Sequence, residues 1–239
     1  MYFLFSGEGP TDLGTCGGNG ESCEGAEFAH GPMVIFVDQI VEENHHYSFL
    51  EGEHYGFVSK HTLVERASEM KAIKKAVRLP GKKQPIETRY FYNNARVFAR
   101  VAIERQQEVN DEVIGILFRD SDGTAAAGRG IWDDKRRSMI DGFIEEGFER
   151  GVPMVPKPKS EAWIICAVKK NSYQECQALE KRSGNDNSPN SLKSELADIL
   201  GEPATREILN PMVDDRTINV EQIVMPSLKA FRDRLEDVI

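Results

Sequence analysis

Hydrophobic and polar residues occur in blocks along the chain that predict strands followed by helices. The apolar run at residues 2–6 (YFLFS) ends at a glycine-rich turn, and the run at residues 112–118 (EVIGILF) stops at Arg119. Both are typical of buried strands, and a shorter run at residues 152–156 (VPMVP) predicts a third.

Helical spacing of apolar residues predicts helices between and after these strands. They cover residues 32–43, 59–77, 87–108, 133–151 and 160–170. In the third of them one face carries Phe91, Ala95, Phe98, Ala102 and Ile103. The fourth begins with acids and ends at a glycine, as the helix dipole favours, and Ser160 is a plausible N-cap of the fifth.

This alternation predicts an α/β fold with a Rossmann-like, largely parallel sheet. We expect one domain over residues 1–239, with a helical insertion at about 30–105 and a helical C-terminal region at about 170–239. Binding and catalytic sites in such sheets gather where the strands end, at their carboxyl edge.

Composition narrows the class of protein. The chain is 40% hydrophobic but has no apolar run long enough to span a membrane, and its start lacks the basic segment of a secretion signal. We therefore expect a cytoplasmic protein without a membrane partner.

The net charge of −9 excludes a generally basic protein that coats nucleic acid, but cations cluster around the break LPGKKQP. The cluster comprises Lys71, Lys74, Lys75, Arg78, Lys82 and Lys83. It is either a contact surface for nucleic-acid phosphates or a solvated helix face.

The four cysteines, at positions 16, 23, 166 and 176, form no CxxC pair. A cytosolic chain would keep them reduced, so we do not expect disulfides. Cys16, Cys23 and His30 could hold zinc, or they could be incidental residues in a flexible, glycine-rich loop.

Carboxylates follow two of the predicted strands. Glu8 lies between two glycines after the first, and Asp120 and Asp122 follow the second. If these strands are neighbours, the three acids converge, and like charges at short range need a cation or a proton to coexist. Mg²⁺ or Mn²⁺ is the expected counter-charge, although each acid taken alone could belong to a solvated loop.

The motifs SGEGPTD and FRDSDG resemble those of the Toprim domain, in particular the nucleases of the overcoming-lysogenization-defect type. The resemblance implies a metal-dependent nuclease in which Glu8 is a metal ligand or general acid–base and Asp120 and Asp122 hold the metal. Asp12 would be an accessory acid. It also implies a partner ATPase in phage defence, which would be a separate chain because no GxxxxGK[ST] motif occurs here.

The segment PKPKSEAW begins the predicted helix at 160–170. By the same resemblance Glu161 is a candidate ligand of a second metal and Lys159 a candidate phosphate contact. The alternative is an acid that the helix dipole alone favours.

Two other functions stay open. DSDGT also resembles the signature of haloacid-dehalogenase-like phosphatases, which would make Asp120 a nucleophile, Asp122 a general acid and Lys159 a neutralising charge, with metal at Asp214 and Asp215. Arg119 stands where that family has an apolar residue, and Glu8 would have no role. The third possibility is a non-catalytic module whose acids bind metal for structure.

Overall fold

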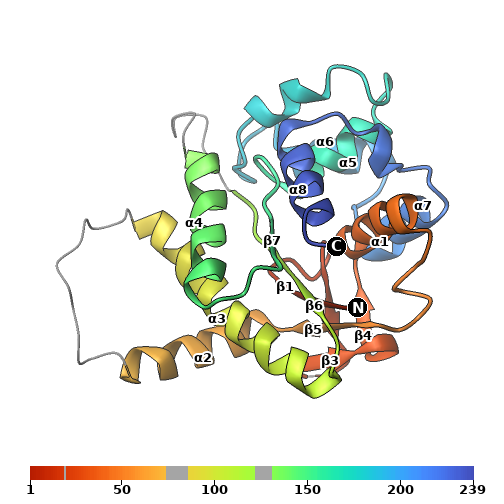
Figure 1. Ribbon diagram of the computed structural model, residues 1–239. Coiled ribbons are helices and arrows are strands. Elements are labelled where there is room, and N and C mark those ends of the chain that lie inside the picture. The colour runs from red at the N-terminus through yellow and green to blue at the C-terminus, as the bar shows by residue number, and fades with distance from the viewer. Residues whose placement is uncertain (19, 74–85, 122–130) are drawn as a thin grey trace.

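The chain folds as a mixed α/β protein around a five-stranded sheet (Figure 1). The computed structural model describes residues 1–18, 20–73, 86–121 and 131–239. The sheet has the order β3-β5-β1-β6-β7. Its strands are β1 (Tyr2–Gly7), β3 (Ser22–Glu24), β5 (Tyr55–Val58), β6 (Val113–Phe118) and β7 (Gly151–Met154). β3 runs antiparallel to β5, whereas β5, β1, β6 and β7 are parallel, so the predicted largely parallel α/β sheet is confirmed.

The strand register aligns the carboxyl ends of the parallel strands. Gly7 of β1 pairs with Phe118 of β6, and Phe118 pairs with Met154 of β7. Ser6 of β1 pairs with Val58 on the other side. The residues that follow β1, β5, β6 and β7 therefore leave the sheet at the same edge, which we call the carboxyl edge.

Helices cover both faces of the sheet (Figure 1). The helices are α1 (Pro32–His45), α2 (Lys60–Ile73), α3 (Ile86–Val109), α4 (Ile131–Glu145), α5 (Ser160–Val168), α6 (Leu192–Leu200), α7 (Arg206–Asp214) and α8 (Pro226–Glu236). Alternate residues of β1 point to opposite faces, as in any strand. Phe3 and Phe5 enter the core shared with α1, α5, α7 and α8, whereas Tyr2 and Leu4 enter the core shared with α3 and α4.

The three predicted strands and five predicted helices all occur, although positions 74–77 of the helix predicted at 59–77 lie outside the described residues. On the long helix α3, Phe91, Ala95, Phe98 and Ala102 are buried as the spacing predicts. The helix predicted at 133–151 ends earlier, at Glu145, because Gly147 takes the left-handed conformation (φ 73°) that reverses the chain toward β7.

The stretch expected as a helical insertion, about 30–105, contains α1, α2 and α3 but also a strand of the main sheet. β5 pairs with β1 and is buried along its length. The glycine-rich segment before it is also ordered into a small antiparallel pair, β2 (Gly14–Cys16) with β4 (Phe28–His30), in addition to β3.

The expectation that the cysteines stay unpaired is wrong in this structure, which contains two disulfides. Cys16 pairs with Cys23, because β2 and β3 bring the two ends of the glycine-rich turn to a Cα separation of 5.7 Å. These two thiols are thus not available to bind zinc beside His30.

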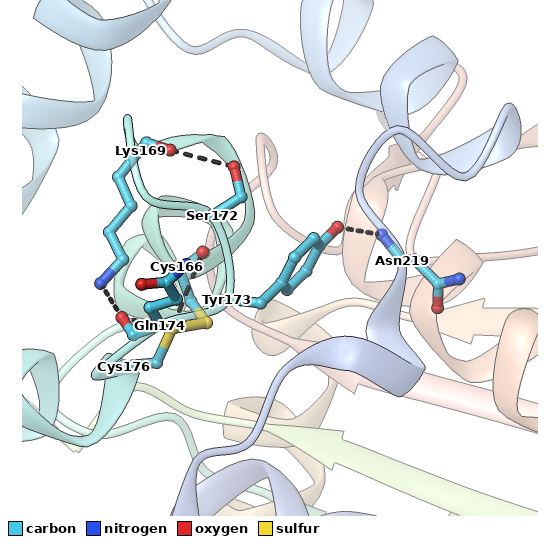
Figure 2. Close-up of a disulfide and its surroundings, with 7 residues drawn as sticks. All are labelled: Cys166, Lys169, Ser172, Tyr173, Gln174, Cys176 and Asn219. Carbon is cyan, nitrogen blue, oxygen red and sulfur yellow. Dashed lines mark hydrogen bonds between the residues drawn. A yellow bond between two sulfur atoms is a disulfide. The ribbon is translucent and has the colours of Figure 1, made fainter.

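The second disulfide joins Cys166 near the end of α5 to Cys176, where the 3₁₀ helix η3 (Cys176–Lys181) begins (Figure 2). Between them, the hydroxyl of Tyr173 donates to the Thr217 carbonyl and accepts from the Asn219 N–H. The disulfide therefore closes the reversal after α5, and the hydrogen bonds of Tyr173 tie this reversal to the C-terminal region. Among the helices described, none is long and apolar enough to cross a membrane.

Candidate functional site

Four segments bring charged side chains to the carboxyl edge of the sheet. They are the loop after β1, the start of α2 after β5, the end of β6, and the start of α5 after β7. Neighbouring parallel strands β1 and β6 deliver Glu8 and Asp120 to this edge, so the condition set by the sequence for their approach is met.

Ser160 links two of the acids. Its hydroxyl donates a hydrogen bond to Asp12, and its backbone N–H donates to Asp120 Oδ1 at 3.2 Å. Ser160 is the first residue of α5 and Lys159 is the N-cap, so the predicted capping role of Ser160 is wrong. The side chain bonds instead to an acid 148 positions away.

The loop that carries Asp12 depends on Gly9. The backbone N–H groups of Asp12 and Leu13 both donate to the Gly9 carbonyl at 3.0 Å, which closes a tight turn. Gly9 has φ 85°, and a Cβ there would lie 2.4 Å from Asp12 Oδ2. Only glycine fits both the conformation and the contact.

Asp12 carries the clearest electrostatic signal of the site. The pKa of its carboxyl is raised to about 6, mainly by burial and also by the nearby charge of Glu161, although the Ser160 hydrogen bond and Lys159 act to lower it. One carboxylate oxygen of Glu161, Oε2, is buried and has no hydrogen-bond partner among the described residues. A buried unpartnered oxygen near a second acid is chemically suited to a hard divalent cation.

Glu8 is engaged by a lysine. Lys60, the first residue of α2, places Nζ 2.8 Å from Glu8 Oε2, and this hydrogen bond raises the pKa of the Lys60 ammonium. Both side chains are partly exposed. An arriving cation or phosphate can therefore compete for either partner.

Arg119 is a fully buried cation beneath this edge. It donates to the Phe118 carbonyl at 2.8 Å and to Asn94 Oδ1 at 2.9 Å, while its Nε has no partner among the described residues. Burial lowers the pKa of the guanidinium, whereas Tyr90 and Glu8 act to raise it. From the sequence, Arg119 was noted only as a departure from the phosphatase signature. Its position directly after a buried strand was the signal that could have indicated a buried cation.

The residue after Asp120 ties this edge together. Ser121 donates from its hydroxyl and its N–H to the Pro158 carbonyl, both at 3.1 Å, and its own carbonyl accepts from buried Lys135 at 2.6 Å. These bonds fix the end of β6 against the segment that leads into α5.

The remaining predicted residues fall into two groups. Lys159 forms an ion pair with Asp186 at 3.0 Å and lies close enough to Asp12 to affect its pKa. Asp122 lies outside the described residues. So do the side chains of the cationic cluster, Lys71, Lys74, Lys75, Arg78, Lys82 and Lys83.

Few potential metal ligands lie close to one another in the described part of the chain. One group of three has its ligand atoms within 4.8 Å of one another, namely Glu21, His61 and Glu65. No three of the acids at the carboxyl edge are that close in the described part of the chain. A metal held by Glu8, Asp12, Asp120 and Glu161 thus requires their carboxylates to turn inward.

The acids required by the phosphatase reading have other partners. Asp214 ends α7, and its charged neighbours are His30 and Asp215. Asp215 accepts from the Thr217 N–H at 2.8 Å. This helix belongs to the C-terminal region that the sequence predicts to be helical.

An open, acidic depression lies at the opposite edge of the sheet. It is lined by Ser22, Cys23, Glu24, Gly25, Ala26, Glu27 and Glu53. Because β3 runs antiparallel, Glu24 lies beside the amino end of β5, away from Asp120. This depression is therefore separate from the carboxyl-edge site.

Fold and site together define an α/β protein with a Rossmann-like sheet whose carboxyl edge carries acids and cations from four segments. No family model, curated protein or solved structure matches the chain.

Proposed function

We propose that the protein is a metal-dependent nuclease that hydrolyses phosphodiester bonds of nucleic acid at the carboxyl edge. The observation that carries the proposal is the linkage of Asp12 and Asp120 through Ser160, beside the unpartnered oxygen of Glu161. Acids from β1, β6 and α5 are thereby brought to one place, where the mutual repulsion of their charges favours a bound cation.

Residue roles follow from position. Asp120, with Asp122 two residues on, and Glu8 would hold Mg²⁺ or Mn²⁺, and Glu161 with Asp12 would hold a second ion or assist the first. The bound ion would lower the pKa of a water molecule and neutralise charge on the scissile phosphate. The chain's own contribution is to orient these ligands and to move protons, with Glu8 as the general acid–base once Lys60 releases it.

Cations would hold the substrate. Lys159 is largely buried beside Asp12 and would contact a phosphate near the site. The cationic cluster from Lys71 to Lys83 would follow the nucleic-acid backbone by charge, without reading bases. These charges contact phosphates, which DNA and RNA share. Selection between DNA and RNA as substrate would depend on contacts to the sugar.

The phosphatase remains the second candidate because Asp120 follows a buried strand and its carboxylate accepts a hydrogen bond from the first N–H of α5. It gives no role to Glu8 or Asp12, whereas the nuclease uses both. A non-catalytic metal-binding module is the third candidate, and it predicts no hydrolysis at all.

A partner ATPase, a role in phage defence and a cytoplasmic location belong to the same proposal. The reducing cytosol would open the two disulfides. Counting free thiols in protein trapped with an alkylating agent during cell lysis therefore tests the location: four free thiols support it, and none contradicts it.

The proposal is tested by comparing Glu8→Gln with Glu42→Gln. Glu42 is a matched control, since it pairs with Arg216 at 2.8 Å just as Glu8 pairs with Lys60 at that distance. We expect Mn²⁺-dependent nicking of plasmid or single-stranded nucleic acid, which Glu8→Gln lowers by about 100-fold or more and Glu42→Gln leaves unchanged.

The phosphatase gives a different result in the same samples. A phosphomonoester or beryllium fluoride would leave an adduct on Asp120, and Glu8→Gln would keep full activity. Either result would overturn the nuclease assignment.

A further inference from the structure

A second group of potential metal ligands lies beside the proposed nuclease site. Glu21 precedes β3, and His61 and Glu65 lie four residues apart on α2, so that they share a helix face. The ligand atoms of the three residues lie within 4.8 Å of one another, and His61 Nδ1 is 3.6 Å from Glu65 Oε2. Two separate elements therefore aim an imidazole and two carboxylates at one point.

The backbone holds Glu21 against the start of α2 independently of these side chains. The Glu21 carbonyl accepts from the Ser59 N–H at 2.8 Å and from the Thr62 hydroxyl at 3.1 Å. The next residue, Ser22, pairs with Val58 in the sheet, and the Cys16–Cys23 disulfide closes the turn behind it. The positions of Glu21 and α2 are thus fixed relative to each other before any ligand binds.

The donor set indicates the class of metal. A simple ion pair between His61 and Glu65 on the helix would not require a third residue. Glu21 adds a second carboxylate, which would repel Glu65 unless a cation lay between them. Carboxylates alone suit Mg²⁺, but an imidazole nitrogen favours first-row transition metals such as Zn²⁺. Three protein ligands leave further coordination positions, which water can fill because all three side chains are exposed.

We infer that Glu21, His61 and Glu65 form a binding site for a divalent transition metal such as Zn²⁺ or Co²⁺, distinct from the carboxylates around Asp120. Lys60 separates the two sites, since its side chain bonds to Glu8 while the next residue, His61, faces Glu21 and Glu65. The assignment does not rest on nuclease activity.

The site is tested by calorimetric titration of the purified, oxidised protein with Zn²⁺. A separate titration with Co²⁺ follows the visible absorption of the bound ion. An Asp120→Asn background weakens the other site and keeps the measurement specific. We expect one ion per chain, and we expect His61→Ala and Glu21→Gln each to weaken binding by at least about 10-fold, as loss of one of three ligands should.

His45→Ala is the matched control, because His45 is also an exposed histidine on a helix surface but lies on α1. It should leave the affinity unchanged. Equal loss in His45→Ala would mean scattered surface binding, and full affinity in Glu21→Gln would mean that the helix pair alone binds the ion. Either result, or no binding by the wild-type protein, overturns the assignment.

Discussion

At the scale of single residues, Asp12 links stability to pH. Its folded pKa of about 6 lies above the value of 3.8 for an exposed aspartate, so the folded state binds more protons between these values and loses stability as pH rises through them. Asp12→Asn removes the charge and keeps an oxygen to accept from Ser160. We expect it to raise the free energy of unfolding at pH 7.5 by about 1–2 kcal/mol and to change it far less at pH 4.

Urea denaturation at the two pH values measures this difference. Asp38→Asn is an informative comparison, because Asp38 also has a pKa raised to about 6 by burial but accepts from Ser48, Phe49 and Leu50 with both oxygens. In Asp38→Asn, the loss of one hydrogen-bond acceptor should cost more stability than removal of the buried charge gains. A stabilisation by Asp12→Asn that is equal at pH 4 and pH 7.5 would contradict the assigned pKa.

Asn94 is the second residue for which burial predicts an effect on stability, because its partner Arg119 is buried. Its Oδ1 accepts from the guanidinium of Arg119, which is 0% exposed. Asn94→Ala removes the acceptor of one N–H group of this buried cation, so we expect a loss of about 1–3 kcal/mol in unfolding free energy. Asn44→Ala, at an exposed helix position with a bond to the Ile40 carbonyl, should change stability by less than about 0.5 kcal/mol. Equal losses in the two variants would show that the buried Arg119 guanidinium does not depend on Asn94.

At the scale of elements, the disulfide Cys16–Cys23 gives a prediction for the glycine-rich segment. It closes a loop with a sequence separation of 7, for which a chain-entropy estimate is about 2 kcal/mol. The double variant Cys16→Ser, Cys23→Ser should lower the thermal midpoint by several degrees while β3 keeps its pairing with β5. An unchanged midpoint relative to oxidised wild type would show that this bond does not form in solution.

The elements that sequence reasoning predicted are those with long, uniform signals. β1 and β6 are each six residues long and buried throughout, so continuous apolar runs marked them. β5 has four residues and β3 only three, and their partners in the sheet are not neighbours in sequence. Such short strands are recognised by the strands with which they pair, and the local pattern of apolar residues does not reveal these partners.

The same limit applies to the site. Glu8 and Asp120 could be found because each follows a predicted strand, whereas the link between Asp12 and Ser160 spans 148 positions. The roles of Lys60 and Arg119 likewise depend on which strands are adjacent. Pairing of the cysteines was missed for this reason, and because a reducing location was assumed.

At the scale of the whole molecule, the cationic cluster predicts how nucleic-acid binding responds to salt. Replacing Lys74, Lys75 and Lys82 with Glu should weaken binding and flatten the dependence of log affinity on log salt, because fewer counterions are released. Replacing Lys170, Lys181 and Lys229, which lie in or beside the C-terminal helices, controls for net charge. A salt slope that is unchanged by the first set, or changed equally by both, would place the interface elsewhere.

Acids from three segments are proposed to hold a divalent cation at the carboxyl edge, and the anomalous difference map of a crystal grown with Mn²⁺ would locate such an ion. We expect a peak that contacts Asp120 together with Glu8 or Glu161, with the carboxylates turned inward from their present spacing. A map with no peak at this edge, or with manganese only at Glu21, His61 and Glu65, would contradict it.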